Sequence, residues 1–96
     1  PLKPLFFVDK SMKELPENSG IILHDKKQDN LNAVKVIYSS ENGNLLEIAA
    51  HLFTSLHSME DDDSVKQIYI EPVAEKGIGI SIMDRLKKAT FQYNQL

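Results

Sequence analysis

The chain has 96 residues, of which 42% are hydrophobic and 26% are charged. This length allows one hydrophobic core but not two, so we expect a single domain over residues 1–96. A net charge of −3 argues against a protein that neutralises a nucleic-acid backbone, which needs a basic face. The absence of cysteine excludes disulfides and thiolate metal sites and fits a cytoplasmic protein. No apolar run is long enough to cross a membrane.

The two ends of the chain carry little pattern. It begins with Pro1 instead of methionine and has no charged-then-apolar leader, so we expect a domain cut from a longer protein. Pro1 and Pro4 favour extended backbone, which predicts a lead-in over residues 1–4. Residues 91–96 are expected to form a frayed tail.

Three short strands are predicted in the first part of the chain. Residues 5–8 and 21–23 are apolar runs, and residues 33–38 are rich in β-branched side chains. Ser11 and Glu14 have the spacing of a capping box, which predicts a helix of about one turn that Pro16 cuts short. The polar residues 25–32 are typical of a loop.

Two helices and a fourth strand are predicted in the second part. Asn44 is a suitable N-cap for a helix that ends near residue 60. Residues at three- and four-residue intervals form its apolar face: Leu45, Ile48, Ala49, Leu52, Phe53 and Leu56. A strand over residues 65–73 follows, and a last helix begins near Gly79. That helix turns these residues inward: Ile82, Met83, Leu86 and Ala89.

Strands that alternate with connecting segments and helices indicate an α/β fold. The apolar runs lack strict alternation, as expected when both faces of a sheet are covered. We therefore predict a small Rossmann-like, three-layer domain with a mostly parallel sheet of about four strands and right-handed crossovers.

Gly77 and Gly79 lie between a predicted strand and a predicted helix. Their backbone amides could bind an anion or a nucleotide phosphate at the helix N-terminus. A dinucleotide fingerprint needs a third glycine, and Ile82 occupies that position. We favour the alternative that both glycines relieve backbone strain in a tight turn and allow close packing.

Four charged residues near this loop are candidates for an interface or a regulatory site. Glu71 and Glu75 flank the loop at the end of a strand, where open α/β sheets bind ligands. Paired carboxylates could hold magnesium or transfer protons, although a solvated loop edge is the simpler interpretation. Asp84 can pair locally within the helix, and Arg85 can clamp a neighbouring segment.

No catalytic or metal site is predicted. Residues 60–63 are acidic but lack the ligand spacing of a calcium loop, which indicates a solvated loop. His24, His51 and His57 share no metal-ligand spacing, so we expect surface or edge histidines. The sequence also lacks a nucleophile elbow and a phosphate-binding loop of the Walker type.

The segment over residues 68–90 resembles the end of a known domain. Glu71-Pro72, Glu75, residues 77–80 (GIGI) and residues 83–86 (MDRL) are similar, in this order, to the C-terminal accessory domain of two-domain, YrdC-type threonylcarbamoyl-AMP synthases. Upstream the similarity is one of layout, and residues 25–43 align poorly. Residues 57–60 also depart from the family's usual pattern.

This resemblance implies a parent enzyme that converts ATP, L-threonine and bicarbonate into threonylcarbamoyl-AMP for the N6-threonylcarbamoyl modification of tRNA adenosine. Its catalytic domain, with ATP and magnesium, would lie outside this chain, and residues 1–4 would end the interdomain linker. We expect an inactive domain without its own cofactor that docks on the catalytic domain and helps close its nucleotide pocket. Contact with tRNA is left open. The alternatives are a free-standing nucleotide- or anion-binding module and a structural or oligomerisation domain.

Overall fold

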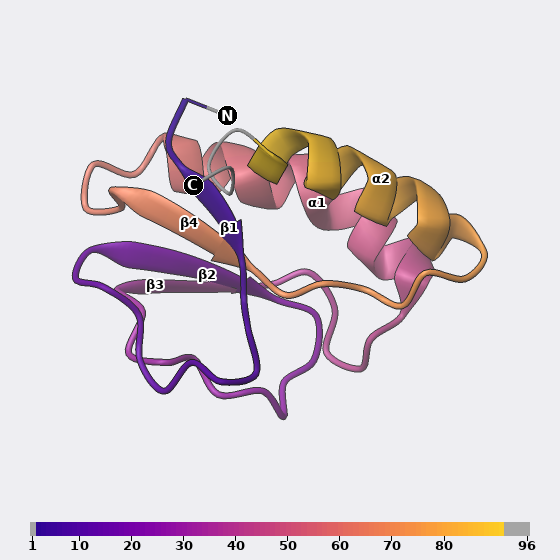
Figure 1. Ribbon diagram of the computed structural model, residues 1–96, viewed down its shortest axis with the longest axis horizontal. Coiled ribbons are helices and arrows are strands. Elements are labelled where there is room, and N and C mark those ends of the chain that lie inside the picture. Colours follow the sequence, from indigo (N-terminus) through magenta and orange to yellow (C-terminus); the bar gives the residue numbers. More distant parts are fainter. Residues whose placement is uncertain (1, 92–96) are drawn as a thin grey trace.

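The computed structural model describes residues 2–91 (Figure 1). Its elements follow in the order β1 (Leu5–Phe7), β2 (Ser19–Leu23), β3 (Lys35–Tyr38), α1 (Leu45–Glu60), β4 (Gln67–Ile70) and α2 (Ile78–Phe91). The predicted strands and both long helices are present; β1, β3 and β4 are shorter than expected, and β2 begins two residues earlier. Phe91 is the last residue of α2, and the rest of the predicted tail lies outside the described residues, as does Pro1.

The four strands form one parallel sheet in the order β1-β4-β2-β3. β4, the last strand in the chain, lies between the first two: Phe6 is in register with Tyr69, and Ile21 is in register with the same residue. All five residues of β2 are buried, as expected for an inner strand covered on both faces. The predicted α/β class with a parallel sheet is confirmed.

Both helices cover the same face of the sheet (Figure 1). The main core lies between them and the sheet, and its fully buried members include Leu5, Ile22, Ile48, Met59, Ile68, Ile70 and Leu86. A second core lies on the opposite face. It contains Leu15, Ile21, Leu23, Leu31 and Tyr69, with Phe6 and Met12 packed against them.

The third layer of the domain therefore consists of two loops, residues 8–18 and 24–34, and not of helices (Figure 1). Pro16 and the polar residues of the second loop leave no apolar face on which a helix could pack. The β1–β2 and β2–β3 connections both pass on this side of the sheet and move in the same direction along the strand order. The β3–β4 connection contains α1, passes on the helical side and moves in the opposite direction. All three consequently have the same hand.

The predicted capping box at Ser11 is wrong, because no helix forms there. The Asp9 carboxylate instead accepts a hydrogen bond from the Ser11 backbone N–H at 2.9 Å, and Met12 N donates to Asp9 O at 3.0 Å. Asp9 competes for the same backbone donors and closes a local turn. The apolar Met12 side chain then turns toward the second core.

The N-terminus of α1 is capped as predicted. Asn44 Oδ1 accepts a hydrogen bond from Glu47 N at 3.0 Å, which satisfies one of the unpaired N–H groups of the first turn. The buried stripe of the helix runs through Ile48, Leu52, Ser55 and Met59. Phe53 follows Leu52 by about 100° around the helix and is 56% exposed, so its predicted place on the inner face is wrong.

Two lysines hold the C-terminal end of α1. Lys3 Nζ donates to Met59 O at 2.8 Å and to Asp62 O at 2.7 Å, and Lys35 Nζ donates to Ser58 O at 3.1 Å. Cations are favourable here because the last carbonyl groups of a helix carry partial negative charge. These bonds fix the lead-in segment before β1 against α1.

The turn before α2 requires both of its glycines. Gly77 has φ of +56°, in the left-handed region that side chains other than glycine rarely adopt. A Cβ atom on Gly79 would collide with the Ala74 carbonyl oxygen. α2 therefore packs directly on the loop that leaves β4, in agreement with the favoured interpretation of these glycines.

We expect Gly79→Ala to lower the free energy of unfolding by about 1–3 kcal/mol, because backbone must move to admit the new methyl group. Urea denaturation followed by circular dichroism measures this effect. Ser81→Ala, at an exposed position of the same helix, is the matched control and should change stability by less than about 0.5 kcal/mol. Equal stability of the two variants would contradict the close approach.

Candidate functional site at the carboxyl edge of the sheet

Three polar residues come together at the carboxyl edge of the sheet, where α1 and α2 also begin. His24 directly follows β2, Ser39 follows β3 and Glu71 follows β4. Neighbouring parallel strands end at the same edge, so these three positions converge although they are far apart in the sequence. The region is the candidate functional site.

His24 joins the other two strands through its ring. The side chain is only 3% exposed, its Nδ1 atom lies 2.5 Å from Ser39 Oγ, and its Nε2 atom lies 2.6 Å from Glu71 O. A carbonyl oxygen only accepts, so Nε2 carries the proton and Nδ1 accepts from the Ser39 hydroxyl. His24 is therefore a buried residue instead of a surface one, whereas His51 and His57 are exposed as expected.

Burial changes the proton affinity of this cluster. It lowers the pKa of His24, although the hydrogen bond to Glu71 O opposes the change. It raises the pKa of Glu71, whose carboxylate accepts a hydrogen bond from His24 N at 2.8 Å. Both shifts favour the neutral form of the group, as expected where water is excluded.

A cavity of about 690 Å³ opens beside this cluster. One wall is apolar and comes from the first turn of α1, the loop after β4 and the start of α2. Six side chains add polar groups to the lining: His24, Asp25, Gln28, Asn44, Glu71 and Lys76. The volume falls within the range of about 300–1,000 Å³ that is typical of small-molecule sites.

The Ser39–His24 pair is not a catalytic dyad. Ser39 is 1% exposed, so no substrate carbonyl can reach its hydroxyl group. The second ring nitrogen of His24 bonds a backbone carbonyl and not a carboxylate, so the imidazolium that a general base forms lacks the charged partner of a catalytic triad. The pair instead ties the ends of three strands together. No group of three possible metal ligands occurs within residues 2–91.

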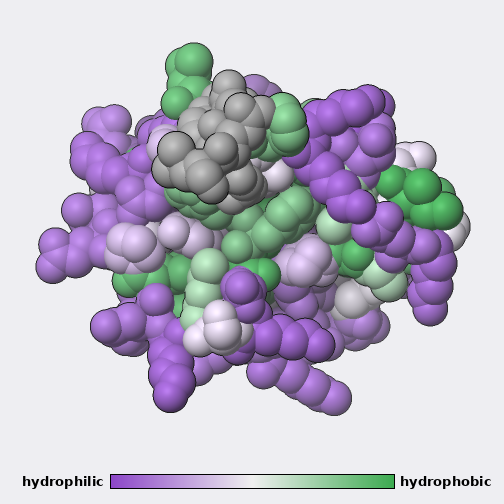
Figure 2. All heavy atoms as spheres, in the orientation of Figure 1, coloured by the Kyte–Doolittle hydropathy of each residue, from purple (hydrophilic) through white to green (hydrophobic). Residues whose placement is uncertain are grey.

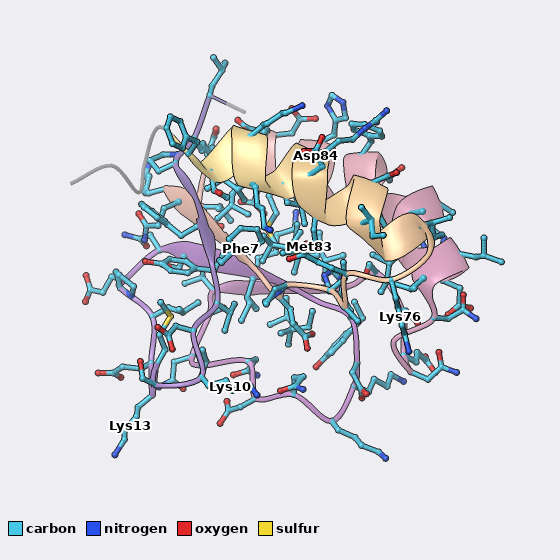
Figure 3. The ribbon with its side chains drawn as sticks, turned by 45° about the vertical axis from the view of Figure 1, so that its right-hand side comes forward. Phe7, Lys10, Lys13, Lys76, Met83 and Asp84 are labelled. Atoms are coloured by element: carbon cyan, nitrogen blue, oxygen red, sulfur yellow. The ribbon has the colours of Figure 1, made fainter. Side chains whose placement is uncertain are left out.

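The other predicted site residues lie apart from this cavity. Glu75 pairs with Lys87 at 2.8 Å, and Asp84 pairs with Lys88 at 3.1 Å on the outer face of α2 (Figure 3). Arg85 lies over the Phe53 ring, 5.7 Å from its centre. The structure therefore brings only Glu71 of these candidates into the cavity.

The two glycines do not line the cavity, and backbone N–H groups of their turn are already hydrogen-bonded. Gly79 N donates to Lys76 O at 2.9 Å, and Ile80 N donates to Gly77 O at 3.2 Å. These N–H groups are therefore used within the turn. Phosphate binding by Gly77 and Gly79 stays a prediction.

The acidic run at the end of α1 has a structural role, through the contacts of Asp62. Asp62 accepts hydrogen bonds from Ser64 Oγ at 2.6 Å and from Ser64 N at 2.9 Å, and it pairs with Lys35 at 3.2 Å. These hydrogen bonds from Ser64, with a smaller contribution from Lys35, lower the pKa of Asp62 to about 2. The run organises the turn between α1 and β4.

The sequence reasoning missed His24, Ser39 and Lys76 as members of one site. A usable signal exists, because His24, Ser39 and Glu71 each stand immediately after an apolar strand. In a parallel sheet, polar residues at such positions share one edge. No local sequence pattern predicts the strand order that makes these residues neighbours.

These features define a small parallel α/β domain without a recognisable catalytic centre in residues 2–91. The family model of the threonylcarbamoyl-AMP synthase C-terminal domain matches residues 5–90. The chain belongs to this family, and the resemblance found in the sequence is confirmed. No curated protein sequence matches the chain. Neither helix within residues 2–91 is long and apolar enough to span a membrane.

Replacement of His24 should change how stability depends on pH. The folded pKa of His24 is below its ordinary value of 6.5, so the unfolded chain binds a proton first as the pH falls through 6.5. The stability that His24 contributes is complete above that pH and is lost below it. We expect the advantage of the wild type over His24→Gln to shrink between pH 7.5 and 5.

Urea titrations at each pH measure this difference, and His57→Gln is the control because His57 is exposed. Glu71 changes stability with pH in the opposite direction, but both proteins retain Glu71, so its contribution cancels in the difference between them. A constant difference between wild type and His24→Gln across this range would contradict the buried, neutral imidazole.

Proposed function

We propose that this chain is the accessory domain of a threonylcarbamoyl-AMP synthase, which docks on the catalytic domain and helps close its nucleotide pocket. The observation that carries the proposal is the family match over residues 5–90. In this proposal ATP, magnesium, L-threonine and bicarbonate bind the catalytic domain, and this chain supplies no reacting group.

The chemistry of the described residues supports this division of labour. The buried Ser39 hydroxyl is inaccessible, and Glu75 and Asp84 are held in surface ion pairs. Adenylate formation needs a bound nucleotide with its metal and charge stabilisation at the reacting phosphate.

We place the docking surface at the groove between α1 and α2. The groove has a volume of about 240 Å³, and its lining includes Phe53, Leu56 and Arg85. Phe53 is 56% exposed, and Arg85 stacks on its ring. An aromatic side chain and an arginine at the centre of an apolar groove are typical of the residues that dominate binding at protein interfaces.

The isolated chain should form no threonylcarbamoyl-AMP from ATP, L-threonine and bicarbonate. Release of pyrophosphate and chromatography of the adenylate measure this activity. A YrdC-type catalytic domain assayed in parallel is the positive control. Turnover by the 96-residue chain alone would show that chemistry resides in it and would overturn the accessory role.

Phe53→Ser should weaken association with a separately supplied YrdC-type catalytic domain by about tenfold or more, because it removes the central apolar contact. Isothermal titration calorimetry measures the dissociation constant. Val34→Ser is the matched control, since Val34 is 52% exposed but belongs to the loop layer on the other side of the sheet. An equal loss of affinity in both variants would show that the groove is not part of the interface.

A further inference from the structure

The cavity at the carboxyl edge lies where the chain leaves two neighbouring strands toward opposite faces of the sheet. β2 and β4 are neighbours in the sheet, but β2 continues into the loop layer and β4 continues toward α2 on the helical face. Such a switch point opens a crevice beyond the strand ends, and ligands of open α/β sheets bind in this crevice. Its floor is rigid because both ring nitrogens of His24 are hydrogen-bonded.

Glu71 presents an acceptor to this crevice. Its Oε1 atom accepts from His24 N at 2.8 Å, and within residues 2–91 no other group donates to the carboxylate. The side chain is half-buried, so its remaining acceptor sites are only partly hydrated. A half-buried carboxylate gains most from a ligand that brings hydroxyl or amine donors.

Apolar side chains form the wall beside Glu71. Leu45 and Val73 line the cavity with Leu46 and Ile78, of which Leu46 is 72% exposed and Ile78 is 41% exposed. Figure 2 shows hydrophobic residues among hydrophilic ones at the right of the view, over the end of the molecule where α2 begins. A flat apolar group placed on this wall would cover surface that water now contacts.

Lys76 supplies the cation of the site. It lies in the loop before α2 and extends toward the segment that leads into α1 (Figure 3). Its ammonium group forms no ion pair within residues 2–91. A phosphate near the cavity mouth could therefore bind it without breaking an existing bond.

The geometry points to a binding site for a nucleoside 5′-phosphate in this cavity. The ribose diol donates to Glu71, the base packs on the apolar wall of Leu45 and Ile78, and the phosphate binds Lys76. A simple sugar would not use the apolar wall. The site goes beyond the accessory role, because it assigns a ligand to this domain itself.

The probe for this site is AMP, titrated into the ¹⁵N-labelled 96-residue chain and followed by NMR. We expect saturable shifts of the Asn44, Glu71 and Lys76 amides. Glu71→Gln keeps an oxygen that can accept from His24 N but loses the charge, so it should weaken AMP about tenfold or more. Dideoxy-AMP, which lacks the ribose diol, should bind the wild type as weakly as AMP binds Glu71→Gln.

Two further variants separate the parts of the site. Glu75→Gln is the matched control on the same loop, and it should bind AMP like the wild type. Lys76→Gln should weaken AMP severalfold but leave adenosine unchanged, because adenosine has no phosphate.

Three results would overturn the site: no saturable shift with AMP or adenosine at millimolar concentration, equal affinity of wild type and Glu71→Gln, or equal affinity for AMP and its dideoxy analogue. These outcomes are independent of the docking role. The groove at Phe53 and the cavity at Glu71 share no lining residue, so either role can fail while the other holds.

Discussion

The position of β4 between β1 and β2 is the constraint on which the rest of this structure depends. It makes β4 and β2 inner strands of a parallel sheet, so both of their faces must be covered by apolar groups. Ile68 and Ile70 face the helices, and Tyr69 faces the loop layer. The two cores are thus consequences of one strand order, and the loops between residues 8 and 34 are as necessary as the helices.

The same strand order also brings polar groups together at the carboxyl edge of the sheet. Every strand of a parallel sheet ends there, and the last backbone groups of each strand need partners. His24 donates to the backbone carbonyl of Glu71 and also accepts from the Ser39 hydroxyl, so it links the ends of β3 and β4 to its own strand. The contacts that close the strand ends also hold one oxygen of Glu71, a residue that lines the cavity. The stability of the strand ends and the proposed ligand site therefore depend on one hydrogen-bonded cluster.

Local patterns in the sequence predicted local structure well. The Asn44 cap and the glycine turn before α2 involve neighbours in the chain, and both are present in the structure. Ser11 was misread because Asp9, two residues earlier, competes for the same N–H group. The burial of His24 and the exposure of Phe53 depend on how distant elements pack. Periodicity alone cannot supply that information.

The pairing of β1 with β4 also determines when the domain can become complete. Leu5 pairs with Ile68, and between them lie two other strands and a whole helix. While a ribosome makes the chain, β1 has no neighbouring strand until residues 67–70 have emerged, since β4 is the one strand that pairs with it within residues 2–91. Contacts this distant in sequence form slowly because a long loop must close first. The apolar residues 5–8 therefore stay unpaired while residues 9–66 are made, and an exposed apolar segment of this kind makes a chain prone to aggregate.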